Sequence, residues 1–130
     1  MPLRGLVEVV LIVDDMDRSL TFYSNVLGLE QISPPHLPAK FLRIGPPGDG
    51  IPRQIVLVPR TLEHGLPDGR LLHHIGLEIA PADYQAEQDR LQALGHVLRY
   101  GKHPFMPVDA FYLDDPDGNE IEIATWRGPA

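Results

Sequence analysis

Two acidic residues and one histidine interrupt apolar, strand-like runs at related positions of the chain. Glu8 opens the run EVVLIV, and His74 opens the run HIGLEI 66 positions later. Near the end of each half, the run QIVL from position 54 corresponds at the same offset to the run EIEI from position 120, which contains Glu122. A carboxylate within an apolar strand costs free energy unless its charge is compensated. The repeat therefore predicts one metal site formed by Glu8, His74 and Glu122.

The types of these three residues indicate which ions the site would hold. Two carboxylates and one imidazole favour Mn²⁺, Fe²⁺ or Zn²⁺. Three protein ligands leave positions open for water or for a substrate that binds through two oxygens. Two ionised carboxylates would neutralise a divalent ion, which favours chelation of an enediolate-like oxygen pair over activation of dioxygen. Taken singly, each residue also has a simpler interpretation, as a surface ion pair, a hydrogen-bonded interior histidine and a surface strand residue.

The repeat predicts the same order of elements in both halves, namely one strand, one helix and three strands. Asp14 or Asp15 is a good N-cap for the first helix, and Gly28 suits its C-terminus. Met16, Leu20, Tyr23 and Leu27 follow at spacings of four, three and four, which is one face of that helix. The expected strands are 6–13, 29–33, 40–44, 53–58, 73–79, 96–100, 109–114 and 119–125, and the second helix is 82–94, closed by Gly95.

Alternation along the strands predicts which face each side chain occupies. Each predicted strand has one wholly apolar face, suited to packing under the helices. Glu8, His74 and Glu122 fall on the opposite faces, so they should line a concave surface between the two halves. His73 alternates with His74 and is expected to point to the helix side or to solvent.

The composition of the chain argues against several classes of function. The 130 residues carry a net charge of −7, contain no cysteine and are 43% hydrophobic. These values predict a single domain, 1–130, of two modules, 1–66 and 70–126, joined near Leu66–Gly69. They argue against nucleic-acid binding, disulfides and a thiolate site. With no apolar run near the length of a membrane span and no signal-peptide pattern at the N-terminus, we expect no membrane partner and a cytoplasmic location.

Three segments resemble the vicinal oxygen chelate superfamily, which includes glyoxalase I, extradiol dioxygenases and bleomycin-resistance proteins. They are residues 8–29, the strand that opens with His74, and residues 111–123. The resemblance implies an α+β fold in which two βαβββ modules form a partly open, mixed-sheet barrel, usually as a homodimer. It also implies metal binding by Glu8, His74 and Glu122. The family normally has histidine where this chain has Glu8, and glyoxalase I has a fourth ligand, glutamate, at the position of Val56.

The same resemblance bears on the reaction. Tyr112 matches a tyrosine that assists ring cleavage in extradiol dioxygenases, and His103 lies close to where those enzymes place a histidine. Next to a metal-bound oxygen these two side chains could act as acid and base. An extradiol-dioxygenase-like reaction on a small molecule is therefore slightly favoured, followed by a glyoxalase-like lyase or isomerase reaction. The alternative is a metal-free protein of the bleomycin-resistance type, whose acidic surface attracts a cationic ligand.

Overall fold

Eight strands form one mixed sheet that carries two helices. The computed structural model describes residues 2–62, 69, 71–114 and 120–128. The strands are β1 (Leu3–Val13), β2 (Glu30–Gln31), β3 (Lys40–Arg43), β4 (Gln54–Pro59), β5 (Leu72–Ile79), β6 (Arg99–Lys102), β7 (Val108–Asp114) and β8 (Glu120–Trp126). The helices are α1 (Met16–Leu20), continued by a wider turn over Thr21–Val26, and α2 (Tyr84–Ala93), with short 3₁₀ turns at Arg60–Leu62 and Pro81–Asp83.

The order of the strands shows the predicted duplication. The sheet runs β2-β3-β4-β1-β5-β8-β7-β6, so the second half mirrors the first about its centre. β1 pairs in parallel with β4, β5 pairs in parallel with β8, and the two halves meet where β1 and β5 run antiparallel. The predicted fold of two βαβββ modules is therefore confirmed. The module limits stay a prediction, because most of the predicted joint, Leu66–Gly69, lies outside the described residues.

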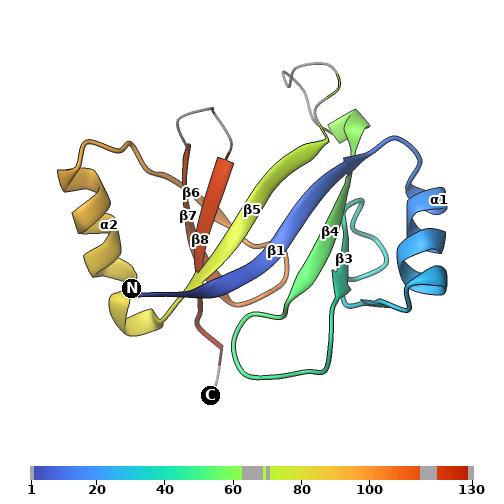
Figure 1. Cartoon of the computed structure of the whole chain (residues 1–130), viewed down its shortest axis with the longest axis horizontal. Helices are drawn as coiled ribbons and strands as arrows, with labels where there is room; N and C mark the ends of the chain where they lie inside the picture. Colours follow the sequence, from blue (N-terminus) through green and yellow to red (C-terminus); the bar gives the residue numbers. More distant parts are fainter. Residues whose placement is uncertain (1, 63–68, 70, 115–119, 129–130) are drawn as a thin grey trace.

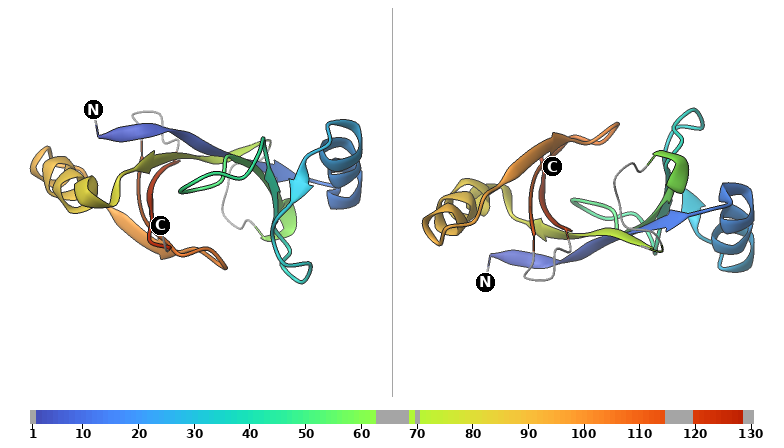
Figure 2. Two further views of the ribbon diagram at one scale, coloured as in Figure 1. Left: turned by 90° about the horizontal axis from the view of Figure 1, so that it is seen from below. Right: turned by 90° about the horizontal axis from the view of Figure 1, so that it is seen from above.

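The sheet is strongly curved and does not close. Figure 2 shows both ends of the sheet bending to the same side, which leaves a concave inner face, while α1 and α2 lie at opposite ends of the molecule. Figure 1 shows β1 and β5 crossing the middle between the two helices. A site formed on β1 and β5 therefore lies at the centre of the concave face, where both modules can contribute to it.

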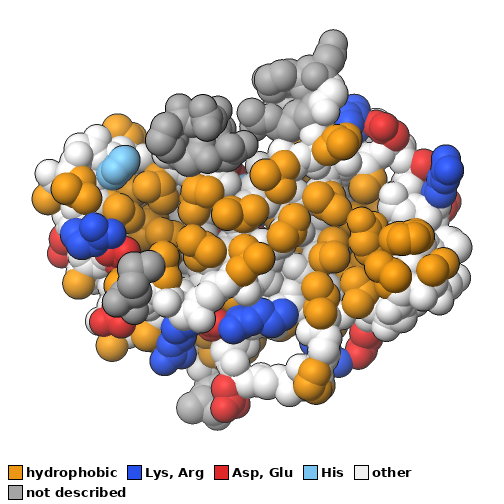
Figure 3. Space-filling view, viewed as in Figure 1, with side chains coloured by type: hydrophobic (Ala, Val, Ile, Leu, Met, Phe, Trp, Pro, Cys, Tyr) orange, Lys and Arg blue, Asp and Glu red, His pale blue; other side chains and the backbone are white. Residues whose placement is uncertain are grey.

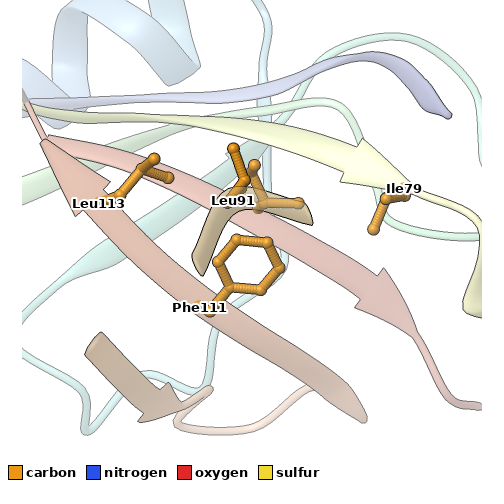
Figure 4. Close-up of a cluster of buried hydrophobic side chains, with 5 residues drawn as sticks. Ile79, Leu91, Phe111 and Leu113 are labelled. Atoms are coloured by element: carbon orange, nitrogen blue, oxygen red, sulfur yellow. The ribbon is translucent and has the colours of Figure 1, made fainter. Parts of the chain in front are cut away.

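The outer face of the second module packs under α2. Ile79, Leu91, Phe111, Leu113 and Ile123 form one buried cluster there (Figure 4), and Phe111 and Ile79 are fully buried. Aromatic and aliphatic side chains of this size each contribute about 1.5–3 kcal/mol through burial. This cluster fixes the positions of β7 and β8, and hence of the inward-facing side chains of these strands.

Two connections reach across the inner face and pack against the opposite module. Ile51, from the β3–β4 connection, packs with Val7, Ala110 and Ala124. Phe105 and Met106, from the β6–β7 connection, pack against a cluster of Val10, Phe41, Val56 and Val58. Apolar side chains of both halves of the chain thus contribute to the concave face.

The first helix differs from its predicted form. Asp15 caps it, as expected, by accepting a hydrogen bond from the Arg18 backbone N–H at 3.1 Å. After Leu20 the backbone widens to bonds between residues five apart, such as Leu27 N to Phe22 O at 3.0 Å. This wider turn rotates Leu27 away from the predicted apolar face, and the side chain is 54% exposed.

The strand predicted at 96–100 begins later, as β6 at Arg99. Gly95, with a φ of 96°, follows α2 in the left-handed conformation, and the His96 N–H bonds to Leu91 O at 3.1 Å. These two features form a Schellman-type cap, so the chain needs residues beyond Gly95 to finish the helix before it can extend.

The outer face over the sheet centre is apolar. Figure 3 shows hydrophobic side chains gathered between the helices, over β1 and β5. Leu6 is 51% exposed there, and Val9, Leu11, Ile75 and Leu77 are partly exposed. No helix among the described residues has the length and apolar character that crossing a membrane requires.

Candidate metal centre

Glu8, His74 and Glu122 converge at the centre of the concave face, and we refer to them as the Glu–His–Glu triad. They come from the neighbouring strands β1, β5 and β8. His74 Nε2 lies 2.9 Å from Glu8 Oε1 and 3.2 Å from Glu122 Oε1. The three ligand atoms all lie within 4.8 Å of one another. The structure therefore brings together the three residues that the sequence repeat singled out.

These separations suit coordination of one ion. Two ligands that each bind a metal at about 2.1 Å and at right angles to one another are separated by about 3 Å. The two carboxylates are 7% and 6% exposed, so an ion between them would be largely shielded from solvent. The donor set, two carboxylate oxygens and one imidazole nitrogen, fits Mn²⁺, Fe²⁺ or Zn²⁺.

Each carboxylate is held by a second, neutral partner. Gln54 Nε2 donates to Glu8 Oε2 at 3.0 Å, and the Tyr112 hydroxyl donates to Glu122 Oε2 at 2.8 Å. One oxygen of each carboxylate is thereby anchored, and the other is directed at His74. Partners of this kind orient metal ligands in proteins.

When no ion is bound, protons on Glu8 and His74 compensate the negative charge of the triad. Burial raises the pKa of Glu8 to about 7. Burial alone would lower the pKa of His74, but its hydrogen bonds to Glu122 and Glu8 outweigh this and raise the pKa to about 9. The pKa of Glu122 is lowered, because hydrogen bonds from its neighbours overcome the cost of burial. Below pH 7, when no ion is bound, a positively charged His74 would therefore lie between a protonated Glu8 and an ionised Glu122.

Sequence reasoning missed Gln54. This side chain is 3% exposed, and its Oε1 has no hydrogen-bond partner among the described residues. Gln54 pairs in register with Glu8, since β4 lies beside β1. The sequence did contain a sign of this role. Gln54 is a polar residue that opens an apolar strand, and it corresponds to Glu120 in the second half of the chain.

Val56 is the residue of this chain at the position where, according to the family resemblance, glyoxalase I has its fourth ligand. It is 2% exposed and packs in the apolar cluster with Val10, Phe41 and Val58. Among the described residues of the first module, Glu8 is therefore the one candidate ligand in this part of the concave face, with Gln54 beside it and Val56 in the apolar cluster.

The two residues predicted to be catalytic occupy different surroundings. Tyr112 is bonded to Glu122, and burial together with the Glu122 charge raises the pKa of its hydroxyl. His103 lies in the β6–β7 connection, where Nδ1 accepts hydrogen bonds from the Phe105 and Met106 backbone N–H groups at 3.2 and 2.9 Å. Its ring packs against Phe41 at a centroid distance of 5.0 Å, and burial lowers its pKa.

The two bonds to Nδ1 fix the chemistry of His103. A nitrogen that accepts from two N–H groups carries no proton, so the neutral ring is protonated at Nε2. That Nε2 atom is buried and has no partner among the described residues. His103 is therefore a fixed hydrogen-bond donor and not a base at Nε2. No described hydrogen bond joins it to the triad.

The helix-side position predicted for His73 was wrong, whereas its side chain is partly exposed, which agrees with the alternative of solvent. Its ring contacts the ring of His74, with centroids 4.9 Å apart, and does not point to the helix side. The register explains the difference: Val10 faces His74 and Leu11 faces Leu72, so His73 is an extra residue in β5. Such a bulge breaks the alternation of faces.

The comparisons agree with this fold. Residues 5–123 match the model of the Glyoxalase/Bleomycin resistance protein/Dioxygenase superfamily, and the chain belongs to this superfamily. No curated protein matches the chain. Several solved structures share the fold at low sequence identity.

Three of these structures are two dioxygenases and one epimerase. The 2,3-dioxygenase LapB from Pseudomonas sp. KL28 is 16% identical, with a TM-score of 0.77, 95% of this chain covered and 41% of that one. An extradiol ring-cleaving dioxygenase from Brevibacterium fuscum is 22% identical, with a TM-score of 0.73, 98% of this chain covered and 33% of that one. Methylmalonyl-CoA epimerase from Mycobacterium tuberculosis is 19% identical, with a TM-score of 0.69, 98% of this chain covered and 91% of that one.

The lengths differ between these relatives. This chain spans about a third to two fifths of the two dioxygenases but nearly the whole of the epimerase.

Proposed function

We propose that the chain is a metal-dependent enzyme that binds a small substrate through two neighbouring oxygens. The observation that carries this proposal is the convergence of Glu8, His74 and Glu122, each from a different strand, on one buried point. Gln54 and Tyr112 support it, because each restrains one carboxylate with a donor that would remain after an ion has bound. Fe²⁺, Mn²⁺ and Zn²⁺ are the candidate ions.

The reaction class that the site supports best is proton transfer at a carbon next to a carbonyl, as in a lyase or isomerase. A bound divalent ion would polarise the oxygen pair of the substrate and acidify the adjacent C–H or O–H group. Glu122 Oε2 is held by the Tyr112 hydroxyl at 2.8 Å, whereas Glu8 Oε2 is held by the Gln54 amide at the longer distance of 3.0 Å. We assign the transfer of the proton to Glu8, the carboxylate with the longer of these two bonds, while Tyr112 keeps Glu122 oriented.

Placing proton transfer before ring cleavage reverses the slight preference for ring cleavage that the sequence indicated. Ring cleavage was favoured because of His103 and Tyr112, yet the Tyr112 hydroxyl is engaged by Glu122 at 2.8 Å. One observation still favours extradiol ring cleavage as the second candidate. The buried Nε2–H of His103 lacks a partner and could donate to an oxygen of a bound substrate.

A hollow at the β3–β4 connection is large enough for a small molecule, although no residue of the triad lines it. It measures about 330 Å³ and is lined by Arg43, the segment 46–53 and Trp126. Trp126 belongs to the same inner cluster as Tyr112 and Ile51. Volumes of this order are typical of small-molecule sites.

A metal-free binding protein is the competing function. The triad without an ion forms a self-contained network in which a charged His74 satisfies both carboxylates. Such a network could be purely structural. The metal content of the purified protein distinguishes the two functions.

The first experiment is therefore elemental analysis of untagged protein after reconstitution with Fe²⁺, Mn²⁺ or Zn²⁺. We expect about one ion per chain in the wild type and a loss of the ion in Glu8→Gln and His74→Ala. The control is Glu30→Gln, which removes an exposed carboxylate paired with Arg43 on the far edge of the first module. Retention of the ion by both triad variants, or no ion in the wild type, would refute the metal site.

The reaction classes are then separated with the reconstituted protein. Incorporation of deuterium from D₂O into α-hydroxy ketones or 2-substituted acyl thioesters, followed by NMR, would support proton transfer. Consumption of dioxygen with catechols, lost in His103→Leu, would support ring cleavage instead.

We also propose that the protein is a homodimer formed through the apolar outer face of β1 and β5. The face is left uncovered by both helices (Figure 3), and Leu6 is 51% exposed on it. Because β1 and β5 run antiparallel at the pseudo-two-fold centre of the sheet, this face is nearly self-complementary, which suits an isologous interface.

A further inference from the structure

His73 lies beside the triad because of a local irregularity in β5. Between the pairs Val10–His74 and Leu11–Leu72, β1 advances by one residue and β5 by two. His73 is the extra residue. Bulges next to active sites commonly redirect a side chain that would otherwise point to the other face. Here the bulge places His73 against His74, although the two residues are adjacent in the strand.

The contact between the two rings is a hydrogen bond between nitrogens. His73 Nδ1 lies 2.7 Å from His74 Nδ1, and the rings meet edge to face at 70°. A bond between two such nitrogens needs a proton on one and a lone pair on the other. Only one of the two residues can therefore be the donor at a time.

The other nitrogen of His74 decides the direction of this bond. His74 Nε2 faces Glu8 Oε1 and Glu122 Oε1, so it is the atom that would bind an ion in the triad. Binding requires an unprotonated Nε2, and a neutral imidazole then carries its proton on Nδ1. His74 Nδ1–H must donate, and His73 Nδ1 must accept.

We propose that His73 is a positioning residue that fixes the tautomer and the ring orientation of His74 for metal binding. This inference rests on the proposed metal site. Metal-ligating histidines generally donate their second N–H to a carboxylate, a backbone carbonyl or water, and this partner strengthens the ligand. In this chain the partner is a second histidine, presented by the bulge.

The surroundings favour this role over a second metal site. The ligand atoms of His73, His74 and Glu120 also lie within 4.8 Å of one another. Glu120, however, is bonded to Arg99 Nη2 at 3.1 Å and is 30% exposed. The positive charge of Arg99 already compensates the Glu120 carboxylate. For an ion to bind between His73, His74 and Glu120, His74 Nδ1 would also have to lose its proton, which it keeps when His74 Nε2 binds an ion in the Glu–His–Glu triad.

The test compares His73→Leu, which removes the acceptor, with His73→Asn, whose Oδ1 stands close to the position of Nδ1. Mn²⁺ binding is measured by electron paramagnetic resonance on both variants and the wild type. We expect His73→Leu to weaken Mn²⁺ binding by roughly 10- to 100-fold and His73→Asn to stay within a few-fold of the wild type. Circular dichroism melts of the same samples show whether each variant is folded.

A second readout does not depend on any variant. Long-range ¹H–¹⁵N NMR of ¹⁵N-histidine-labelled protein, with and without Zn²⁺, reports which nitrogens carry protons. We expect His74 to be protonated at Nδ1 in the Zn²⁺ form, with His73 unprotonated at Nδ1. A His74 that is unprotonated at Nδ1 in that form would overturn the inference.

The outcomes separate this inference from the proposed function. If the wild type binds Mn²⁺ and His73→Leu binds it equally well, the function stands and the role of His73 is refuted. Two ions per chain, reduced to one in His73→Leu, would mean that His73 is itself a ligand and would also refute the role. If the wild type binds no ion, the proposed function fails and this inference fails with it.

Discussion

Gly76 of β5 lies opposite Glu8 of β1, and the side chain of Glu8 occupies the space that a Cβ on Gly76 would need. A Cβ at this position would lie 2.5 Å from Glu8 Cγ. Gly76 also pairs in register with Glu122 of β8, so it lies between the two carboxylates of the triad. The glycine in the run HIGLEI is therefore a spatial requirement of the site, since its backbone φ is not positive.

Gly76→Ala should displace Glu8 and weaken metal binding by about tenfold or more, which is the usual effect of misplacing a ligand. Overpacking should also destabilise the fold by about 1–3 kcal/mol. The control is Gly48→Ala, because a Cβ at Gly48 would have no neighbour within 4 Å. Isothermal titration with Mn²⁺ and thermal melts measure the two effects. Unchanged Mn²⁺ affinity in Gly76→Ala would show that Glu8 is not a ligand.

Tyr112→Phe removes the hydroxyl that anchors Glu122 Oε2 at 2.8 Å. If Tyr112 orients the ligand, metal affinity should fall by roughly 10- to 100-fold. Tyr100→Phe is a matched control, because it removes a hydroxyl bonded to Gln88 at 3.0 Å, away from the triad. A Tyr112→Phe variant that keeps its metal and loses turnover would instead assign Tyr112 to the substrate.

Metal binding should strengthen as the pH rises. When no ion is bound, the pKa of Glu8 is about 7 and the pKa of His74 is about 9, both above their ordinary values. Both groups hold a proton below pH 7, and an ion must displace both. The logarithm of the association constant should then rise by about two per pH unit below pH 7 and by about one between pH 7 and 9. Titrations with Mn²⁺ at pH 6, 7 and 8, at constant ionic strength, test this, and a flat profile would contradict it.

Periodicity predicted the triad but not its surroundings. Glu8, His74 and Glu122 could be placed together because a repeat offset and strand alternation suffice to bring repeat-related positions to one sheet face. The position of His73 depends on a bulge, and the bulge is set by the pairing of β5 with β1, which the pattern of one strand does not contain. Gln54 was missed for a related reason: its meaning depends on pairing with Glu8 across two strands. The wider turn that exposes Leu27 likewise has no mark in the apolar spacing of the first helix.

The outer face of the sheet provides the last prediction. If two copies associate through β1 and β5, a charge at Leu6 would be buried without a partner in the dimer, so Leu6→Glu should shift the protein to monomers. Val97→Glu is the control, since Val97 is 79% exposed in the connection between α2 and β6, away from the sheet centre. Sedimentation velocity over a range of protein concentrations measures the effect, with circular dichroism to show that the variants are folded. A wild type that sediments as a monomer at all concentrations would refute the dimer. A dimer that survives Leu6→Glu would place the interface elsewhere, because an unpaired carboxylate at the centre of an apolar contact should cost several kcal/mol.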